Sequence, residues 1–400
     1  MLYSQLKTPS FIIYEDKINK NLIELNQALS VTWGNYIIGY SYKTNSLPWI
    51  IDYMNKKGCY AEVVSNVEYE LALKYGNSPK NIIFNGPNKG KSQFIEAITK
   101  GSIVNVDSWK EMNWLQEIKL TSDIGIGVRV NFDLEKECPS ETVMGDEGGR
   151  FGFSYEKGDF KKIIDQINAL EHIKVNGIHL HNSSKTRSIK IFEVIASKAC
   201  EIANLFEYEL DFINVGGGFF GGLPDRPTFL EYMQSISAIL SKRFNNKNTT
   251  LIVEPGASLI ATPISFLCEV IDVKDTIKKR IVTVNGSRNN IDPFMNKTNY
   301  FLDLLVKNED RNGVKEQVVC GYTCMEHDRL IKLEDKKELE VEDRLLFNYV
   351  GSYTMCFSPL FIEYFPIVYV ENNNTFTCVR EAWGVEEYCQ KSIIKEDNIN

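Results

Sequence analysis

Short apolar runs alternate with amphipathic stretches over roughly the first 260 residues of the chain. Eight runs stand out between about residue 35 and residue 254, each ending in a loop and most followed by a helical pattern. Continuous apolar strands that alternate with amphipathic helices indicate a parallel sheet whose outer face is covered. Eight such units predict a (β/α)8 barrel, which typically needs about 250 residues. The runs are NYIIGYSY, CYAEVV, NIIFNG, SIVNVD, IGIGVRVNF, VNGIHLH, DFINV and TTLIVE.

The pattern changes after Gly256. Strand-like runs recur there with turn residues between them and little helical periodicity, which predicts an all-β domain. These runs are RIVTVNGS, KEQVVCGYT, DRLLFNYVG and PIVYVE, and the N-terminal run PSFIIY is expected to join them. We therefore expect a barrel over residues 15–260, and a β-sandwich or barrel-like domain formed by residues 1–14 and 261–400.

Composition narrows the class of protein. Of the 400 residues, 43% are hydrophobic and 24% are charged, which is ordinary for a globular protein that buries a core. The formal net charge of −8 and the lack of a Lys/Arg block argue against a nucleic-acid partner. No stretch approaches a membrane span, and the start lacks the features of a signal peptide. Nine scattered cysteines suit reduced thiols, so we expect a soluble cytoplasmic protein.

The predicted barrel strands end in polar residues or glycines. Active sites of such barrels lie at the carboxyl ends of the strands, so this pattern predicts a site there. In chain order the strand ends are Lys43, Glu62, Asn85, Asp107, Arg129, His181, the glycines Gly216, Gly217 and Gly218, and Glu254.

Several of these residues have a structural alternative. Lys43 could be a surface lysine just beyond its strand. Asp107 precedes SWKE and is expected to cap a helix, as is Ser65 in SNVE. His179 and His181 share one face of their strand by alternation, so one of them could be a buried, hydrogen-bonded histidine.

A glycine run, NVGGGFFGG, follows the seventh strand. It formally contains GxGxxG, but Pro224 and Pro227 interrupt the helix that a dinucleotide-binding turn requires. Glycines at this place suit a phosphate cradle, because barrels often bind phosphate beside strands seven and eight. A phosphate cradle, a lysine and a strand-end carboxylate together indicate pyridoxal phosphate. That cofactor needs a lysine to hold it covalently and an acidic partner for its ring nitrogen.

A zinc site is the alternative for Cys320, Cys324 and His327, which have C-x3-C-x2-H spacing. The chain has only four histidines and no second CxxC-like pair to complete a tetrahedral set. We therefore predict no metal site.

Six segments in order resemble the barrel-type pyridoxal-phosphate decarboxylases, the ornithine and diaminopimelate decarboxylase family. The resemblance covers nearly the whole chain and rests on YSYKTN, GIHLHNSS, NVGGG, VEPG, CGYTCMEHD and GSYT. It implies that Lys43 holds the cofactor, that His181 stacks on its ring and that Glu254 pairs with the pyridine nitrogen. It also implies that Cys324 donates a proton. The further expected cofactor contacts are Glu62, Arg129, Ser184, Gly216, Gly217, Gly218 and Tyr353.

The chain departs from the family's pattern where substrate and phosphate are bound. The phosphate-binding arginine that usually follows EPG is Ala257. The acidic residue that often follows the cysteine and contacts the substrate's distal amine is Met325. The Arg-Pro pair that helps diaminopimelate decarboxylases to recognise the distal carboxylate is Asp292-Pro293. An aspartate near the cofactor lysine is Glu62, and a glycine in the histidine motif is Ser183. The cofactor chemistry is thus supported more strongly than the usual substrates.

We expect pyridoxal-phosphate-dependent decarboxylation of an amino acid or amino-acid derivative to an amine and CO2. Plain diaminopimelate and ornithine are not the expected substrates, and Met325, Glu326 and Asp292 are the expected substrate contacts. The alternatives are an amino-acid racemase of the same fold and a non-catalytic relative that acts as a binding protein. The resemblance further implies a homodimer with shared sites, in which Arg150 of one subunit pairs with Asp328 of the other.

Overall fold

A computed structural model describes residues 3–393 of the chain. These residues form two compact units. Residues 19–260 make one unit; residues 3–18 together with 261–393 make the other, so the division falls within helix α1 (Glu15–Thr32). Residues 1–2 and 394–400, the ends of the expected β domain, lie outside the described residues.

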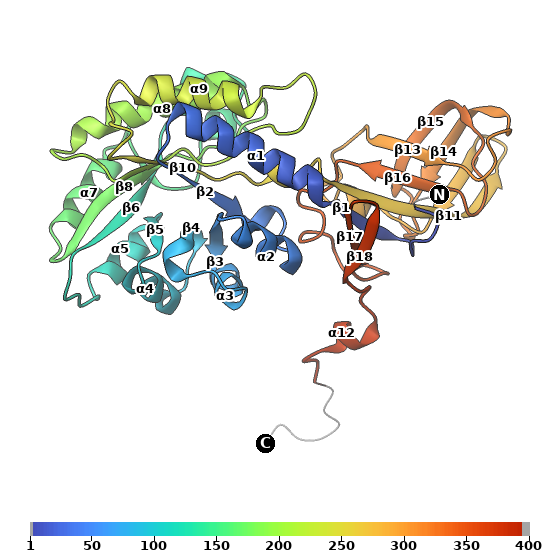
Figure 1. Cartoon of the computed structure of the whole chain (residues 1–400), viewed down its shortest axis with the longest axis horizontal. Coiled ribbons are helices and arrows are strands. Elements are labelled where there is room, and N and C mark those ends of the chain that lie inside the picture. Colours follow the sequence, from blue (N-terminus) through green and yellow to red (C-terminus); the bar gives the residue numbers. More distant parts are fainter. Residues whose placement is uncertain (1–2, 394–400) are drawn as a thin grey trace. The chain divides into compact units, whose positions relative to one another are not determined.

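The unit of residues 19–260 is a closed eight-stranded parallel barrel with helices on its outside (Figure 1). Each strand pairs with the next along the chain, and β10 pairs with β2 to close the barrel. The strands are β2 (Tyr36–Ser41), β3 (Tyr60–Ser65), β4 (Ile82–Asn88), β5 (Ile103–Val106), β6 (Ile124–Asn131), β8 (Ile173–His179), β9 (Phe212–Asn214) and β10 (Thr250–Val253). All eight predicted apolar runs supply these strands, so the predicted barrel is confirmed.

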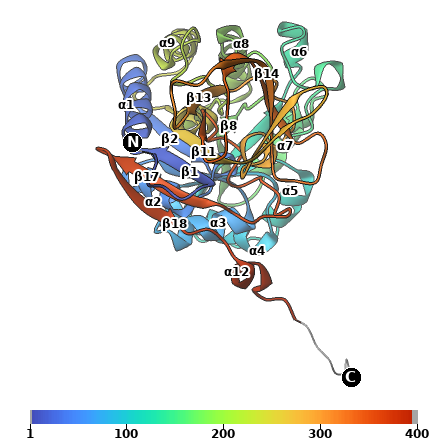
Figure 2. The ribbon, with the colours of Figure 1, turned by 90° about the vertical axis from the view of Figure 1, so that its right-hand side faces the viewer.

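The helices between the strands form a ring around the barrel (Figure 2). Each presents one apolar face to the strands. In α7, for example, the residues at helical spacing Phe160, Ile163, Ile164 and Ile167 are buried. The helices are α2 (Pro48–Lys56), α3 (Asn66–Lys74), α4 (Lys91–Thr99), α5 (Trp109–Leu115), α6 (Leu134–Glu137), α7 (Asp159–Asn168), α8 (Ile189–Ile202), α9 (Phe229–Leu240) and α10 (Ala257–Ile260); a short strand β7 (Phe153–Ser154) pairs with β6.

A cluster of apolar side chains packs within the barrel. Ile83, Phe212 and Ile252 pack together there, with Ile37 and Tyr60 against them. The polar residues of the strands lie toward the carboxyl ends, where the sequence predicted the site.

The unit of residues 3–18 and 261–393 is a sheet domain. Its longest sheet path runs β15-β14-β12-β11-β1-β17-β18, and β16 and β13 continue from β11. The strands are β1 (Ser10–Tyr14), β11 (Ile264–Asp275), β12 (Arg280–Val284), β13 (Phe301–Leu305), β14 (Gly313–Cys320), β15 (Arg329–Lys337), β16 (Arg344–Asn348), β17 (Ile367–Asn372) and β18 (Thr375–Arg380), with short helices α11 (Arg288–Ile291) and α12 (Val385–Cys389).

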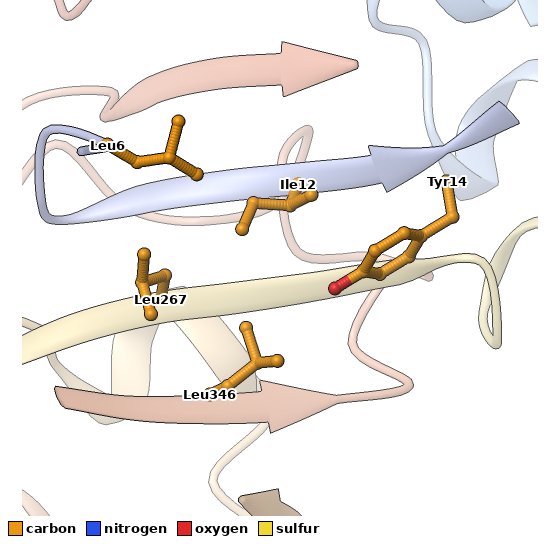
Figure 3. Packing of buried hydrophobic residues seen from close by; sticks show 5 residues of the cluster. All are labelled: Leu6, Ile12, Tyr14, Leu267 and Leu346. Atoms are coloured by element: carbon orange, nitrogen blue, oxygen red, sulfur yellow. The ribbon is translucent and has the colours of Figure 1, made fainter. Parts of the chain in front are cut away.

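The N-terminal strand joins this domain as predicted. Strand β1 lies between β11, to which it is antiparallel, and β17, to which it is parallel. Leu6, Ile12 and Tyr14 of the N-terminal segment form a buried cluster with Leu267 of β11 and Leu346 of β16 (Figure 3). Burial of such side chains contributes roughly 1.5–3 kcal/mol each, so the N-terminal segment is an integral part of the domain.

The sequence pattern missed four strands of this domain. They are β11, β13, β15 and β18. Strand β15 reads RLIKLEDKK and exposes five of its nine residues, so its composition is that of an exposed edge strand with little apolar signal.

Candidate functional site

Lys43 lies two residues beyond the buried end of strand β2, at Ser41. It occupies a single 3-10 turn (Tyr42–Thr44), and its Nζ is 2.7 Å from Oε2 of Glu62, the third residue of β3. The Glu62 side chain is 1% exposed, whereas that of Lys43 is 37% exposed, and the Ser41 hydroxyl also donates to Glu62 Oε2. The amine is thus held beside a buried carboxylate although its side chain is partly exposed, a contact that a simple surface lysine does not require.

Asparagine side chains connect this carboxylate to a second one. Asn85 Nδ2 donates to Glu62 Oε1 at 2.9 Å and to Glu254 Oε1 at 2.7 Å. Asn214 Nδ2 donates to the same Glu254 oxygen at 2.5 Å. Asn105 Nδ2 donates to Asn85 Oδ1 at 2.8 Å, which fixes the amide orientation of Asn85 with its NH2 group toward both carboxylates. Neutral donors therefore hold two buried negative charges close together.

Glu254 is ionised in this setting. Burial alone would raise its pKa, but the contact with His179 and the positive charge of Lys43 outweigh burial and hold the pKa well below its usual range. His179 Nε2 lies 3.3 Å from Glu254 Oε2. The site therefore offers a carboxylate suited to a protonated ring nitrogen.

His181 is the second of two roughly parallel imidazoles. Its ring centroid is 6.3 Å from that of His179, with 15° between the planes. Burial, and then the positive charges of Arg129 and Lys43, lower the pKa of His181 to about 3. His181 is therefore a neutral, flat surface at neutral pH, and His179 is the buried histidine of the pair.

The glycine run passes directly over His181 and Glu254. Gly217 N donates to His181 Nδ1 at 3.2 Å, and Gly216 has a left-handed φ of 70°. A Cβ on Gly217 would lie 2.0 Å from the backbone oxygen of Glu254, and one on Gly216 would lie within 2.4 Å of the His181 ring. Only glycine fits at either place. Nearby, the hydroxyl of Ser258 is buried with no hydrogen-bond partner among the described residues, and Ala257 begins helix α10.

Asp107 does not cap a helix, so that prediction is wrong. The N-cap of α5 is Ser108, whose hydroxyl accepts from Glu111 N. Asp107 Oδ2 instead accepts from Arg129 NH1 at 3.1 Å, and Arg129 NH2 donates to His181 O at 3.2 Å. Arg129 is therefore a buried cation beside His181 rather than an exposed one. The cap predicted at Ser65, by contrast, is confirmed.

Ser184 lies just after His181 on the same loop. Its hydroxyl accepts from Arg187 N at 3.0 Å, and its backbone bridges to Thr142. The hydroxyl proton remains to be donated, so the predicted contact with phosphate stays a prediction.

The sheet domain carries the other predicted residues, some of them exposed and some buried. Cys324 is exposed, and the Glu326 side chain is 99% exposed. Met325 is partly exposed in the same loop. Tyr353 has a left-handed φ of 60° and packs edge-on against Phe294, with 5.8 Å between ring centroids.

Asp292 and Asp328 are buried inside that domain rather than presented at its surface. Arg288 NH2 and Lys297 N donate to Asp292 Oδ2 at 2.9 and 2.8 Å. Asp328 accepts from Thr323 Oγ1 at 2.6 Å, and also from Ser287 and the Arg288 backbone. These partners give both carboxylates an internal structural role, which argues against Asp292 as a substrate contact and against a pair between Asp328 and Arg150. Arg150 is exposed and lies over the Phe151 ring.

Sequence reasoning listed Asn85 as a strand end but missed its bridging role, and it missed Asn105, Asn214 and the role of His179. A signal was present, because each is a polar residue inside a largely apolar run: IIFNG, IVNVD, FINV and GIHLH. In a barrel filled with apolar side chains, an inward polar residue near the strand end marks the polar layer of the site.

Within residues 3–393, no group of three or more His, Cys, Asp or Glu side chains could hold a metal ion, and no helix has the length and apolarity to cross a bilayer.

The residues at the barrel mouth fit pyridoxal phosphate. A lysine amine, an ionised carboxylate and a neutral imidazole lie just beyond the carboxyl ends of the barrel strands β2, β10 and β8. Beside them is a backbone turn that only glycine can form, together with an unpartnered buried hydroxyl. These groups match the aldehyde, the ring nitrogen, the ring face and the phosphate of that cofactor.

Comparisons with known proteins agree with a pyridoxal-phosphate site. Two family models match in succession: "Pyridoxal-dependent decarboxylase, pyridoxal binding domain" over residues 15–261, and "Pyridoxal-dependent decarboxylase, C-terminal sheet domain" over residues 261–351. Diaminopimelate decarboxylase of Methanocaldococcus jannaschii is 29% identical over 372 residues, covering 88% of this chain and 83% of that protein. The probable chloroplastic diaminopimelate decarboxylase of Oryza sativa subsp. japonica is 26% identical, covering 96% of this chain and 79% of that protein.

Solved structures share the fold along the whole chain. The crystal structure of the M. jannaschii diaminopimelate decarboxylase has a TM-score of 0.87 at 24% identity and covers 99% of this chain and 94% of its own. The Paramecium bursaria Chlorella virus arginine decarboxylase has a TM-score of 0.76 at 20% identity, covering 92% and 96%. The chain belongs to the pyridoxal-phosphate-dependent decarboxylases of the ornithine and diaminopimelate decarboxylase family.

Proposed function

We propose that this decarboxylase acts on an amino acid or amino-acid derivative other than plain ornithine or diaminopimelate. The observation that carries the proposal is the burial and pairing of Asp292. Asp292-Pro293 is the nearest match to the Arg-Pro pair that diaminopimelate decarboxylases tend to have. Its buried carboxylate is bound by Arg288, so this position offers neither a free cation for a distal carboxylate nor a free anion for a distal amine. Met325 likewise provides an apolar side chain where an acidic residue often stands.

The relatives support a second candidate substrate. Both relatives named above are called diaminopimelate decarboxylases, which favours diaminopimelate. At 26% and 29% identity, substrate contacts are free to differ while the cofactor chemistry is kept.

Some of the chain's own residues would hold the cofactor, and others would transfer a proton. Bound pyridoxal phosphate accepts the electron pair that CO2 leaves behind on the α-carbon. Lys43 is positioned to hold the cofactor and to be displaced by the substrate amine, while Glu254 favours a protonated ring nitrogen. His181 supports the ring face, and the glycine run, whose Gly217 N donates to His181 Nδ1, leaves open space at Gly218 for the phosphate. Cys324, or Lys43 once released, then supplies the proton to the former α-carbon.

Membership of this family favours decarboxylation over the racemase and the non-catalytic alternative. A racemase needs two opposed bases at the α-carbon, and a binding protein has no use for a lysine held over a buried carboxylate.

Release of CO2 over a substrate panel tests the function. The panel contains meso-diaminopimelate, L-ornithine, L-lysine and L-arginine, together with their side-chain-acylated derivatives where these exist. We expect the highest kcat/KM for a compound other than meso-diaminopimelate and L-ornithine. Highest kcat/KM for meso-diaminopimelate would establish the second candidate instead, and no CO2 from any compound by cofactor-loaded protein would contradict the proposed amino-acid substrates.

We further propose a homodimer whose sites are shared, with Cys324 completing the barrel site of the neighbouring subunit. Lys43→Ala and Cys324→Ala should then each be nearly inactive, and mixing them under subunit exchange should restore activity. With random two-fold pairing about half of the dimers are mixed and one of their two sites is intact, so about a quarter of sites recover. No recovery despite demonstrated exchange would contradict shared sites.

A further inference from the structure

One buried ion pair of the barrel has no part in the proposed chemistry. Lys89 and Glu111 have side-chain exposures of 0% and 1%, and their Nζ and Oε1 atoms are 3.1 Å apart. Lys89 also donates to the backbone oxygen of Gly86 at 2.7 Å. Burial lowers the pKa of Lys89 and raises that of Glu111, so each residue depends on the other to remain charged. A pair that is costly to bury and adjoins the site calls for a role.

The second oxygen of Glu111 connects the pair to Asp107. Glu111 is the third residue of α5, a place from which glutamate commonly reaches back to the N-cap backbone. Here its Oε2 accepts from the N–H of Asp107 at 2.8 Å, one residue before the N-cap Ser108. Helix capping alone would therefore explain the position of Glu111 but not the fully buried lysine behind it.

Asp107 in turn fixes the edge of the site. Its Oδ2 binds Arg129 NH1 at 3.1 Å, and its Oδ1 accepts from Gly152 N at 3.0 Å. Arg129 NH2 donates to His181 O, and its guanidinium lies 4.6 Å from the centroid of the Phe151 ring. A continuous series of contacts thus runs from Lys89 to the backbone oxygen of His181, the residue whose imidazole faces the cofactor position.

We propose that Lys89 and Glu111 are positioning residues that fix Asp107, and through it Arg129 and His181, beside the cofactor. The inference rests on the proposed cofactor site. The ammonium of Lys89 keeps Glu111 charged and fixes the orientation of its carboxylate. Glu111 then binds the backbone N–H of Asp107, and the Asp107 carboxylate orients Arg129. An apolar pair would fill the same volume without making the hydrogen bond to Asp107 N.

Two double variants separate positioning from simple stability. Both remove the buried charges together, so neither leaves an unpaired ion. Lys89→Met/Glu111→Gln keeps an acceptor for Asp107 N, whereas Lys89→Met/Glu111→Met does not. Outer partners that orient metal ligands are typically worth about 10–100-fold, and we expect a similar weakening of pyridoxal-phosphate binding by the Met/Met apoprotein. The Met/Gln variant should remain within about threefold of wild type.

Nuclear magnetic resonance of the apoprotein gives a readout that a purely structural role would not move. The chain has only four histidines, which makes the titration of His181 traceable. If Arg129 is loosened, the pKa of His181 should move up toward its ordinary value in the folded Met/Met variant and stay low in the Met/Gln variant. If the Met/Met variant does not fold, Glu111→Asp takes its place, because it keeps the charge but is one methylene shorter.

The outcomes are distinct. Wild-type cofactor affinity and an unchanged His181 titration in the Met/Met variant, or in Glu111→Asp where that replaces it, would overturn the positioning role, whatever the change in melting temperature. Failure of the wild-type protein itself to bind pyridoxal phosphate would overturn the proposed site, and the His181 titration in the apoprotein would still decide the positioning role.

Discussion

Both units of this protein bury carboxylates, but Asp343 of the sheet domain and Glu254 of the barrel have different kinds of partner. In the sheet domain, Asp343 is 0% exposed and accepts from the backbone N–H groups of Lys307 and Glu340 and from Arg311. At the barrel mouth, Glu254 is held by the amides of two asparagines. The first carboxylate is neutralised by a guanidinium in direct contact. The second has neutral amide donors on one oxygen and keeps its charge.

The difference shows how to tell a structural carboxylate from a functional one. Burial alone does not distinguish them, since Asp343 and Glu254 are both at least 96% buried. The nature of the donors does. Neutral amides satisfy one oxygen of Glu254 without cancelling its charge, and its other oxygen lies 3.3 Å from His179 Nε2.

The largest effect on cofactor binding and turnover should come from replacing Lys43 in the barrel. Lys43→Ala should abolish the visible absorbance of covalently held cofactor and most turnover, because no other amine is expected to hold the aldehyde. Lys56→Ala is a matched control, since Lys56 lies on α2 with its side chain 71% exposed in an ion pair with Asp52. Normal turnover and an unchanged spectrum in Lys43→Ala would refute the assignment.

The next effect breaks the comparison directly, by neutralising one carboxylate in each unit. Glu254→Gln keeps acceptors for Asn85 and Asn214, so we expect a small change in stability but a loss on the order of 100-fold in kcat/KM. Asp343→Asn turns an amide NH2 group toward backbone donors or Arg311 and should lower the free energy of unfolding by about 1–3 kcal/mol. Its cofactor absorbance below the melting temperature should be unchanged. The opposite pattern, with stability lost in Glu254→Gln and activity lost in Asp343→Asn, would contradict the distinction.

A smaller effect concerns the phosphate, for which the barrel offers backbone donors but no arginine after EPG. Ala257→Arg should tighten cofactor retention about tenfold if its guanidinium reaches the phosphate, since a charged hydrogen bond contributes about 1.5 kcal/mol or more. Ala257→Met is the control for size without charge. Equal retention by Ala257→Arg, in a folded protein whose guanidinium is seen on the phosphate, would show that another cation already serves.

The sequence predicted the residues that end strands and failed on those that depend on neighbouring strands. Lys43 and Glu254 follow apolar runs, so one strand at a time was enough to find them. Asn85 acts by bridging β3 and β10, and its role depends on the closed order of the barrel. Asp107 was wrongly predicted as a cap, because its partner Arg129 is 22 residues away and the next residue, Ser108, takes the cap. Local patterns identify elements, whereas charge pairing across strands has to be observed.

The smallest expected effect is the pH dependence that His181 gives to stability. Its native pKa of about 3 lies below the ordinary value of about 6.5, so the unfolded chain takes up the proton first as the pH falls. The free energy of unfolding should therefore fall on the order of 1 kcal/mol between pH 7 and pH 5, and this fall should be absent in His181→Phe.

His172 gives the opposite sign and serves as the control. A hydrogen bond with Asp123 raises its pKa, so it stabilises the fold below its ordinary pKa and loses that effect as the pH rises. His172→Gln should thus lower stability more at pH 5 than at pH 7. Chemical denaturation of the apoprotein at both pH values measures all three proteins. Parallel pH dependences in wild type and His181→Phe would mean that His181 is not held neutral by the site.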